Sequence, residues 1–481
     1  MTGFLAFCFV VGYIAIHLAF IARALLRPHR EPSSRMAWVL VMLMVPIGGI
    51  VAYIFFGETN IGRKRAAKYK ETSGTIGRYT DTHPSPDPYS NIPSPHGQIF
   101  RTGQSISGFL PVGGNAAELM RDSVSAIDRM VADIDAAQDH VHIMFYIWLE
   151  DVTGLRVVEA LKRAAGRGVT VRAMADDLGS RRLIKSEHWR AMAAAGVNLG
   201  RALPIGNPLL HPIRGRVDLR NHRKIVVIDN AITYCGSQNC ADAEFLVKPK
   251  FAPWVDLLIR FEGPVARQNQ WLFVQDWMTH VDEDLSDLPT RAPAEPDRGP
   301  VVAQVNGTGP TVRASAMPEM FEALLHGARR RLTITTPYFV PTEAMQSAIC
   351  AAAYRGVEVR FVLPKRNDSR VVDAAAKSYY YDLLKAGVRI FEYPKGLLHT
   401  KSLTLDGDVS MIGSANLDRR SFELNYENNI LFYDKALSAA LLARQEEYIA
   451  DSHEITLQDV RDWSVWRRLW YNSIAMMGPV L

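Results

Sequence analysis

Cysteine is scarce in this chain, and its few copies are scattered. The sequence has 481 residues and only 4 cysteines. They show neither the paired spacing of a zinc site nor the density of a disulfide scaffold, and one of them lies inside an apolar run. We therefore expect no metal site and no disulfide framework. The cysteines are Cys8, Cys235, Cys240 and Cys350.

A strong excess of one charge is also missing. Lysine and arginine together number 55, against 50 aspartates and glutamates, for a net charge of +5. This modest excess attracts polyanions or anionic lipid surfaces only weakly. No strongly basic segment with interleaved aromatic residues, as in many nucleic-acid-binding proteins, is present. We therefore expect no nucleic-acid partner.

Long apolar runs occur only near the N-terminus. Residues 3–22 are apolar apart from His17, and residues 36–56 form a second apolar run. Each run is about long enough to cross a bilayer, so the sequence predicts a hairpin of two transmembrane helices over residues 1–58. A cleaved signal peptide is the alternative, but the basic segment that precedes such an apolar run is missing.

Basic residues on both sides of the second apolar run bear on membrane orientation. Three arginines lie before or at its start, and a denser basic cluster covers residues 63–70. The denser cluster favours a cytoplasmic catalytic portion, whereas the arginines between the runs point the other way. The three arginines are Arg27, Arg30 and Arg35.

Composition divides the rest of the chain. Residues 59–97 begin as a basic juxtamembrane segment and then become rich in Pro, Ser, Thr and Asp, which predicts an extended linker from residue 71 onward. A second proline-rich and acidic linker covers residues 286–300. These boundaries predict one domain over residues 98–285 and another over residues 301–481.

The two predicted domains share repeated segments. The hexapeptide at 167–172, Arg-Gly-Val-Thr-Val-Arg, returns at 355–360 as Arg-Gly-Val-Glu-Val-Arg. Residues 154–165 have helical periodicity, and residues 169–173 have the composition of a strand. Alternation of helix and strand in each unit predicts an α/β fold made of two homologous halves.

One group of ionisable residues also occurs in both halves. A histidine is followed by a lysine after one residue, by an aspartate after four more, and then by Gly-Ser-x-Asn after six. The two copies are His222, Lys224, Asp229, Ser237 and Asn239, and His399, Lys401, Asp406, Ser414 and Asn416.

This pattern suits phosphodiester chemistry that needs no metal. One histidine can attack phosphorus while the other protonates the leaving oxygen. The two lysines and the two asparagine amides can hold phosphoryl oxygens that gain charge in the transition state. Ser237 and Ser414 either assist in this or serve a tight turn. Alternating residues predict strands over 225–228 and 402–405. Asp229 and Asp406 follow these strands and precede Asn or Gly, so we interpret them as turn residues, although they belong to the repeated motif and are counted among its catalytic candidates.

Two further carboxylates follow the motifs. Asp256 lies downstream of His222, and Glu427 lies downstream of His399. We expect each to accept the N–H of the histidine in its own half, which fixes the tautomer and favours the imidazolium. A surface acid beside a strand is the alternative.

The duplicated His-x-Lys-x4-Asp motif resembles the catalytic motifs of the phospholipase D superfamily. The resemblance narrows to bacterial cardiolipin synthases through the two apolar N-terminal runs and four short segments: 35–38, Arg-Met-Ala-Trp; 220–224, Arg-Asn-His-Arg-Lys; 254–256, Trp-Val-Asp; and 420–427, Arg-Ser-Phe-Glu-Leu-Asn-Tyr-Glu. It implies two phospholipase D-like halves, each a mixed β-sheet flanked by helices. It also implies that His222 forms a phosphohistidine and that His399 is the general acid and base, although spacing alone does not distinguish the two roles.

The function that this resemblance implies is cardiolipin synthesis. A phosphatidyl group would pass between two phosphatidylglycerol molecules in the bacterial cytoplasmic membrane, giving cardiolipin and glycerol, with no cofactor. The alternatives are a membrane-anchored phospholipase D that uses water, a nuclease of the same superfamily and an inert lipid-binding scaffold. The sequence does not indicate an oligomeric state.

Two other groups of residues bear on lipid contact. Loop arginines are candidates for binding lipid phosphate or for simple solvation. Near the C-terminus, tryptophans alternate with arginines, which is typical either of a helix at a headgroup interface or of a helix packed on the core. The loop arginines are Arg214, Arg216, Arg220, Arg419 and Arg420, and the tryptophans are Trp463, Trp466 and Trp470.

Overall fold

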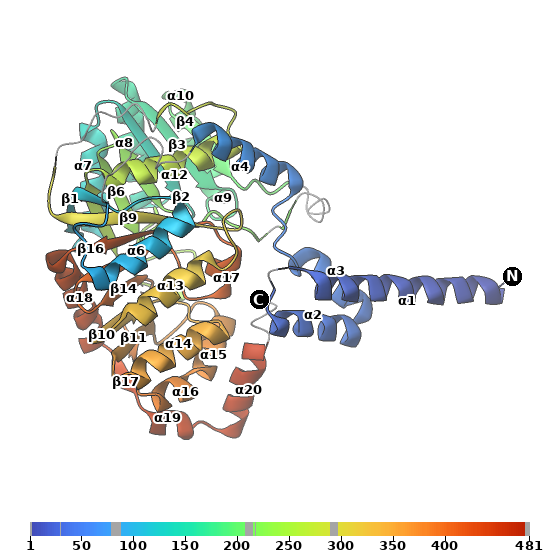
Figure 1. Cartoon of the computed structure of the whole chain (residues 1–481). Coiled ribbons are helices and arrows are strands. Elements are labelled where there is room, and N and C mark those ends of the chain that lie inside the picture. The colour runs from blue at the N-terminus through green and yellow to red at the C-terminus, as the bar shows by residue number, and fades with distance from the viewer. Residues whose placement is uncertain are drawn as a thin grey trace.

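The computed structural model describes residues 2–28, 30–77, 88–206, 215–216, 218–288 and 297–476. Its body is a mixed α/β structure in two halves, from which the N-terminal helices project to one side (Figure 1). The helices are α1 (Thr2–Leu26), α2 (Pro32–Met44), α3 (Pro46–Phe56), α4 (Arg63–Ile76), α6 (Ser94–Ser107), α7 (Ser123–Ala136), α8 (Val152–Gly166), α9 (Arg181–Lys185), α10 (Glu187–Ala194), α12 (Val265–His280), α13 (Ala316–Gly327), α14 (Glu343–Tyr354), α15 (Arg370–Ser378), α16 (Tyr380–Lys385), α17 (Arg419–Glu423), α18 (Lys435–Ala450), α19 (Leu457–Arg461) and α20 (Val465–Met476).

The strands of the two halves form one continuous sheet. Its order is β17-β12-β11-β10-β14-β15-β16-β9-β1-β8-β6-β5-β2-β3-β4. The first half supplies β1 (Val112–Leu119), β2 (His140–Phe145), β3 (Thr170–Asp176), β4 (Asn198–Ala202), β5 (Ile225–Ile228), β6 (Ile232–Gly236) and β8 (Leu258–Glu262). The second supplies β9 (Val301–Thr308), β10 (Arg331–Thr335), β11 (Glu358–Pro364), β12 (Arg389–Tyr393), β14 (Ser402–Leu405), β15 (Val409–Gly413), β16 (Glu427–Tyr433) and β17 (His453–Ile455).

The internal duplication predicted from sequence is visible in the sheet. In each half three strands pair in parallel, β2-β3-β4 and β10-β11-β12, and the first of them pairs antiparallel with β5 or β14. The repeated hexapeptides lead into β3 and β11, as predicted. The predicted helix over 154–165 and the strands over 225–228 and 402–405 are confirmed as α8, β5 and β14.

The halves are joined more closely than two domains on a linker. Strand β1 pairs antiparallel with β9 at the centre of the sheet, and one hydrophobic core takes residues from both sides of that junction. Ile99, Phe100 and Ile106 of α6 lie in the core of the second half, although residue 98 was predicted to open the first domain. The reason is the amphipathic face of α6, which packs along β9 and α13.

The segment that follows the apolar runs differs from its prediction. Residues 63–76 form helix α4 rather than a basic tail leading into an extended linker. This helix packs along α12, and its Ser73 Oγ accepts a hydrogen bond from Gln275 Nε2 at 2.8 Å. Tertiary packing therefore overrides the polar composition. Part of the predicted linker, residues 78–87, and most of the second one, residues 289–296, lie outside the described residues.

The predicted pair of transmembrane helices is found only in part. Among the described residues one helix, Gly3–Leu26 within α1, is long and apolar enough to cross a membrane. The second apolar run is broken at Val45 into α2 and α3, of 13 and 11 residues. Pro46 causes the break, because its ring cannot continue the hydrogen bonding of α2. A second membrane-length helix is therefore not formed.

Candidate active site

The two histidines lie where short segments of one half pair with short segments of the other. The two-residue strand β7 (Trp254–Val255) of the first half pairs in parallel with β13 (Leu397–Leu398) of the second. An isolated bridge joins Asn221 and Tyr426 in the same way. As a result, His222 N–H donates to the carbonyl of Tyr426 and His399 N–H donates to the carbonyl of Val255, both at 2.9 Å.

Each histidine is paired with a carboxylate of the opposite half. His222 Nδ1 lies 2.8 Å from Glu427 Oε2, and His399 Nδ1 lies 2.7 Å from Asp256 Oδ1. The sequence-based prediction paired each carboxylate with the histidine of its own half, and this is wrong. Pairing of segments across the halves explains the difference. The carbonyls of Tyr426 and Val255 accept the backbone N–H groups of His222 and His399, and the next residues in the chain are Glu427 and Asp256. Both Nε2 atoms remain directed away from the carboxylates.

The two motif serines hold the carboxylates. Ser237 Oγ donates to Asp256 Oδ1 at 2.6 Å, and Ser414 Oγ donates to Glu427 Oε2. Glu427 has two further donors on Oε1, Ser421 Oγ at 2.8 Å and Asn425 Nδ2 at 3.3 Å. The carboxylate behind His222 is therefore more heavily hydrogen-bonded than the one behind His399.

The two lysines are buried beside the histidines. Lys224 and Lys401 are each only 3% exposed. Each ammonium donates to the backbone carbonyl of its own histidine, at 2.7 Å in Lys224 and 2.6 Å in Lys401. Burial lowers the pKa of Lys224 to about 8 and that of Lys401 to about 7, against the attraction of the nearby carboxylates. Two N–H bonds of each ammonium remain for an anionic group.

Burial makes both histidines weaker bases than a free imidazole. Burial lowers the pKa of His222 to about 4 despite the opposing effect of Glu427. Burial together with Lys401 also lowers the pKa of His399. Burial would raise the pKa of both carboxyl groups, but their histidine partners outweigh it and both pKa values are lowered. The site thus combines two weakly basic imidazoles, ionised carboxylates and two lysines that act on the opposite half, since Lys401 lowers the pKa of His222 and Lys224 lowers that of His399.

The two motif asparagines lie next to these groups with different contacts. Asn239 Oδ1 accepts from the backbone N–H of Ile147 at 3.2 Å. Asn416 contacts Ser421 Oγ through its backbone N–H at 3.0 Å and through Nδ2 at 3.4 Å. Asn416 therefore helps to place a serine that supports Glu427, while Asn239 keeps its amide nitrogen for another acceptor.

The two motif aspartates lie away from this site. Each comes after a four-residue strand, β5 or β14, so it is separated from the lysine by about 15 Å of chain. Asp229 accepts three backbone N–H bonds at 2.9 Å, from residues 138–140, and Asp406 accepts three from residues 329–331. Both have positive φ, 52° and 55°. They hold turns, as we interpreted them, and do not contact the histidines.

Three aromatic rings next to the histidines were not recognised as site residues. The Trp254 ring lies 4.5 Å from the His399 ring, and the Tyr146 ring lies edge-on 5.0 Å from the His222 ring. Tyr338 approaches His399 at 6.5 Å. The Trp-Val-Asp segment was noted only for its resemblance. The tyrosines gave no signal because neither belongs to a repeated motif.

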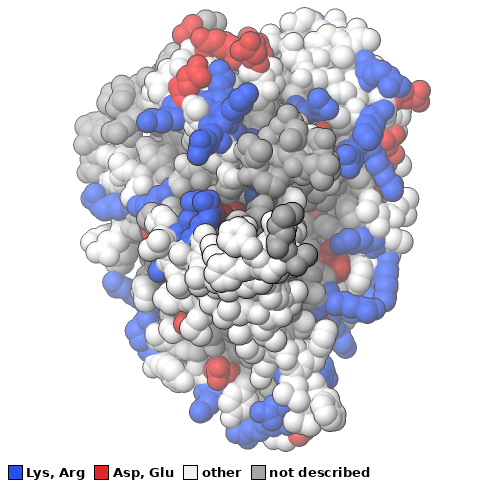
Figure 2. All heavy atoms as spheres, turned by 90° about the vertical axis from the view of Figure 1, so that its right-hand side faces the viewer, with Lys and Arg blue, Asp and Glu red and all other residues white. Residues whose placement is uncertain are grey.

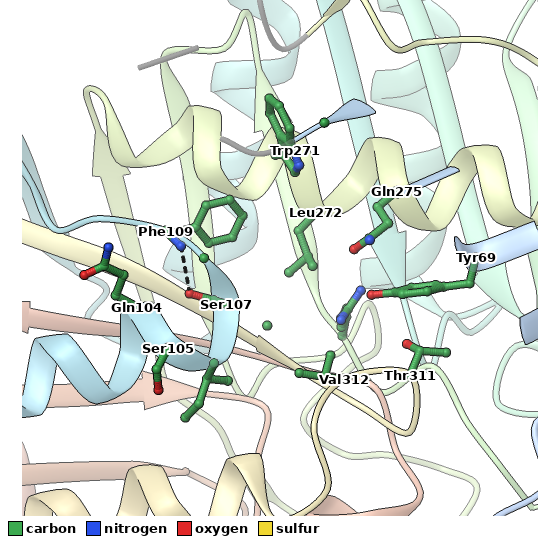
Figure 3. Close-up of a pocket in the computed structure, with 15 residues that line it drawn as sticks. Tyr69, Gln104, Ser105, Ser107, Phe109, Trp271, Leu272, Gln275, Thr311 and Val312 are labelled. Atoms are coloured by element: carbon green, nitrogen blue, oxygen red, sulfur yellow. Dashed lines mark hydrogen bonds between the residues drawn. The ribbon is translucent and has the colours of Figure 1, made fainter. Parts of the chain in front are cut away.

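Arg223, between the motif histidine and lysine, faces the other way. It is fully buried and pairs with Asp276 at 2.7 Å. It also donates to the carbonyls of Thr308 at 3.1 Å and Glu427 at 3.2 Å, both in the second half. Arg223 lines a pocket of about 530 Å³ that neither His222 nor His399 lines, and Figure 3 shows Tyr69, Gln275 and Thr311 at one end of it. This residue ties the halves together rather than facing the histidines.

The loop arginines that the sequence offers for lipid phosphate are engaged within the protein where they are described. Arg216 pairs with Asp218 at 2.5 Å, Arg220 with Asp176 at 3.1 Å, and Arg420 with Asp218 at 3.2 Å. Arg419 pairs with Glu31 at 2.9 Å. Arg214 lies outside the described residues. Within the described part of the chain, no group of three or more His, Cys, Asp or Glu is arranged to hold a metal ion.

Comparison with known proteins gives the same picture of duplicated halves. A family model described as "Cardiolipin synthase, PLD-like domain" matches residues 130–248 and again 321–448, and "Phospholipase_D-nuclease N-terminal" matches residues 13–58. Cardiolipin synthase A of Serratia proteamaculans is 34% identical over 100% of both chains. The chain belongs to the cardiolipin synthase family. The cardiolipin synthase A of Yersinia pseudotuberculosis is also 34% identical, over 98% of each chain.

One solved structure supports the fold of the body. Phosphatidylserine synthase of Haemophilus influenzae aligns with a TM-score of 0.57 and 13% identity, over 80% of this chain and 100% of its own. At that identity the likeness concerns the fold alone. The two matched regions of the cardiolipin synthase family model each contain one histidine-lysine pair, and the second also contains Glu427, whereas Asp256 lies just beyond the end of the first.

Proposed function

We propose that this member of the cardiolipin synthase family transfers a phosphatidyl group from one phosphatidylglycerol to another, giving cardiolipin and glycerol. The observation that carries the proposal is the crossed pair His222–Glu427 and His399–Asp256, with a buried lysine beside each histidine. The names of its full-length relatives support the same product.

In the first step His222 Nε2 attacks the phosphorus of phosphatidylglycerol. Its Nδ1–H is held by Glu427, so Nε2 carries the lone pair and Glu427 stabilises the positive charge that the ring gains. A P–N bond forms as the bond from phosphorus to the headgroup glycerol oxygen breaks. His399 gives that oxygen a proton, and glycerol leaves.

In the second step the terminal hydroxyl of another phosphatidylglycerol attacks the phosphohistidine. Its proton passes to neutral His399 as its oxygen bonds to phosphorus, and the P–N bond to His222 breaks. His399 thereby returns to the protonated form that began the cycle. Asp256 stabilises that form, because its carboxylate accepts the Nδ1–H of His399 at 2.7 Å.

The hydrogen bonds on the carboxylates support this division of roles. Glu427 accepts from three side chains besides His222, whereas Asp256 accepts from Ser237 besides His399. A carboxylate with fewer competing donors favours its imidazolium more strongly. His399 is therefore the more readily protonated of the two, as a general acid must be, whereas His222, with its pKa lowered to about 4, is in the neutral form that attack on phosphorus requires.

The lysines and Asn239 hold the phosphoryl oxygens in this proposal. Burial in a site of low dielectric strengthens the attraction between an ammonium group and a phosphoryl oxygen. Asn239 has an amide nitrogen to donate, while Asn416, Ser237 and Ser414 act through the carboxylates. Asp229 and Asp406 support the fold of the two halves.

The proposed location is the bacterial cytoplasmic membrane, with lipid as both donor and acceptor. The long apolar helix α1 supports it, since nearly all of its side chains are exposed outside the body. A multi-pass arrangement would need a second span, for which α2 and α3 are each too short.

Purified protein incubated with phosphatidylglycerol alone tests the reaction. We expect equal amounts of cardiolipin and glycerol, and loss of both in His222→Ala and His399→Ala. An excess of phosphatidic acid would instead show that water accepts the phosphatidyl group. Lipid binding without any turnover in the unaltered protein would favour a scaffold.

A further inference from the structure

The second apolar run folds back on itself. Trp38 in α2 and Tyr53 in α3 have ring centroids 5.4 Å apart, although 15 residues of continuous helix would separate them by about 22 Å. A Cβ on Gly49 would lie 2.6 Å from the carbonyl oxygen of Val41, so the two helices touch at their backbones. Helices α2 and α3 form a hairpin whose turn is at Val45.

Both ends of this hairpin lie against the phospholipase D-like body. At its start, Arg30 pairs with Glu423 at 2.6 Å and Glu31 pairs with Arg419 at 2.9 Å. At its end, the carbonyl of Phe56 accepts a hydrogen bond of 2.6 Å from Arg216. A span between those two ends would separate them by the hydrocarbon core, about 30 Å thick. They are instead held on the same side.

The last turn of α1 meets the same place. Arg23 pairs with Glu58 at 2.6 Å, and Tyr53 Oη donates to the same carboxylate at 3.1 Å. All the charged groups of this region therefore gather at the base of the hairpin. Such a base fits the headgroup region, where ion pairs remain hydrated.

The turn of the hairpin is apolar and uncovered. The side chains around the turn are 57–73% exposed and none is charged. Exposed apolar residues continue along α1, so the surface is continuous with the one described helix that can cross a membrane. Figure 2 looks onto this face and shows an uncharged mass projecting toward the viewer, with Lys and Arg around it. The turn residues are Leu43, Met44, Val45 and Ile47.

Helix α20 adds a second apolar surface on this side of the molecule (Figure 1). Its Tyr471 and Ile474 are buried in a cluster with Val340, Ala374 and Ala375. Its opposite face exposes Trp466 by 78% and Trp470 by 56%. Tryptophan prefers the boundary between headgroups and hydrocarbon, so one helix here packs on the protein with one face and offers tryptophans with the other.

We infer that the chain crosses the membrane once, through α1, and that the α2–α3 hairpin enters only the leaflet next to the catalytic body, with α20 resting on that leaflet. Helices of 13 and 11 residues reach about 20 and 16 Å, roughly half of the bilayer. Backbone groups at the turn find partners within the protein: the N–H of Val45 donates to the carbonyl of Val41, the carbonyl of Val45 accepts from the N–H of Gly49, and the carbonyl of Met42 lies 2.8 Å from His17 Nε2.

This arrangement removes the conflict between the two basic clusters. The arginines before α2 and the cluster over 63–70 lie on one side, and together they place the catalytic body in the cytoplasm and the N-terminus on the opposite side. Both lipid substrates would then come from the cytoplasmic leaflet. The inference rests on the proposed membrane location and not on the transfer chemistry.

Cysteine labelling in intact cells tests the topology. The parent is full-length Cys8→Ser/Cys350→Ala, because Cys235 and Cys240 are buried. Reporters are Gly3→Cys, Pro32→Cys and Lys64→Cys, at exposed positions. Spheroplasts are treated with a membrane-impermeant maleimide before and after permeabilisation, and cardiolipin synthesis is assayed separately as a check on each variant.

We expect Gly3→Cys to react in intact spheroplasts, and Pro32→Cys and Lys64→Cys to react only after permeabilisation. Two spans would instead make Pro32→Cys react from outside while Gly3→Cys and Lys64→Cys are protected. Protection of all three in intact spheroplasts would show that α1 does not cross. Either of these results overturns the inference, whatever lipid product is found.

The position of α20 is tested in vesicles that contain phosphatidylcholine brominated in the upper acyl chain. Bromine quenches tryptophan only on contact. We expect quenching of the purified protein, and a smaller quenched fraction in Trp466→Ser/Trp470→Ser. Val124→Ser, a change at an exposed apolar position of α7, is the matched control. An unchanged quenched fraction in the double variant would show that α20 does not touch the bilayer.

Discussion

Nδ1 of His222 lies 2.8 Å from Oε2 of Glu427, a residue 205 positions later in the chain and in the other half of the fold. The mirror contact, between His399 and Asp256, spans 143 positions. Neither half therefore holds a complete histidine-carboxylate pair. Catalysis requires the two halves to be docked, and each carboxylate can be altered to test the histidine of the opposite half.

Glu427→Gln should abolish most activity while leaving the fold intact. The amide keeps the shape of the carboxylate but cannot stabilise the imidazolium of His222, and the corresponding change in a serine protease triad costs about 10⁴-fold. We expect kcat for cardiolipin formation to fall about 10³- to 10⁴-fold with little change in melting temperature.

The histidine that each substitution affects distinguishes the crossed pairing from a pairing of histidine and carboxylate within the same half. In a stopped assay that measures glycerol release and cardiolipin formation separately, Glu427→Gln should impair glycerol release through His222. Asp256→Asn is the matched variant and should impair proton transfer through His399, with the larger effect at high pH. Glycerol release needs both histidines, so the pH profile separates the pairings: a larger effect at high pH in Glu427→Gln than in Asp256→Asn would contradict the crossed pairing.

Asp229→Asn should reduce stability rather than turnover. Its carboxylate accepts three backbone N–H bonds at a residue with φ of 52°, a conformation that asparagine also tolerates. Weaker acceptance of those bonds should lower the free energy of unfolding by about 1–3 kcal/mol. Denaturant unfolding measures the loss, and Asp406→Asn should behave alike. A fully stable Asp229→Asn protein with no activity would place the carboxylate in the chemistry.

Arg223→Met should destabilise the junction of the halves. It leaves Asp276 buried without its partner, and breaking a buried ion pair typically costs about 3–5 kcal/mol. Arg223→Met/Asp276→Leu removes both charges and should recover part of that loss. A double-mutant cycle in denaturant measures the coupling. Strictly additive effects would show that the two buried charges do not stabilise each other.

Binding of phosphatidylglycerol should weaken as pH rises from about 6 to 9. Lys401 has a pKa of about 7 and Lys224 of about 8, so above these values the neutral amine must take up a proton to bind the phosphate as an ammonium. Linkage then raises KM by up to about tenfold per pH unit for each lysine. Lys401→Arg, which keeps its charge, should flatten the part of the profile near pH 7. A KM that is constant over this range would contradict the lowered lysine pKa values.

Local patterns predicted the repeated core of the fold well. The periodicity around the duplicated hexapeptides and motifs gave α8, β3, β5 and β14 in both type and position. Their side-chain spacing reflects the sheet faces directly. The turn role of Asp229 followed from its neighbour Asn230, and positive φ at both residues agrees with it.

What depends on contacts between distant segments was not predictable in this way. The pairing of β7 with β13, which decides which carboxylate serves which histidine, has no local signal, because both strands are two residues long. Helix α4 looks polar as a sequence and is ordered by α12. The length of an apolar run also does not show that Pro46 turns it back on itself. Tertiary packing decides the first two, and the ring of Pro46 together with the packing of α2 on α3 decides the third.

The most direct test of the account is capture of the covalent intermediate. Protein is mixed briefly with phosphatidylglycerol labelled at phosphorus, quenched under alkaline denaturing conditions and digested, and the labelled peptide is identified by mass spectrometry. The crossed site with His222 as nucleophile predicts label on the peptide that contains His222, and none in His222→Ala. Label on the His399 peptide, or cardiolipin formed at full rate with no labelled protein at any time, would contradict it.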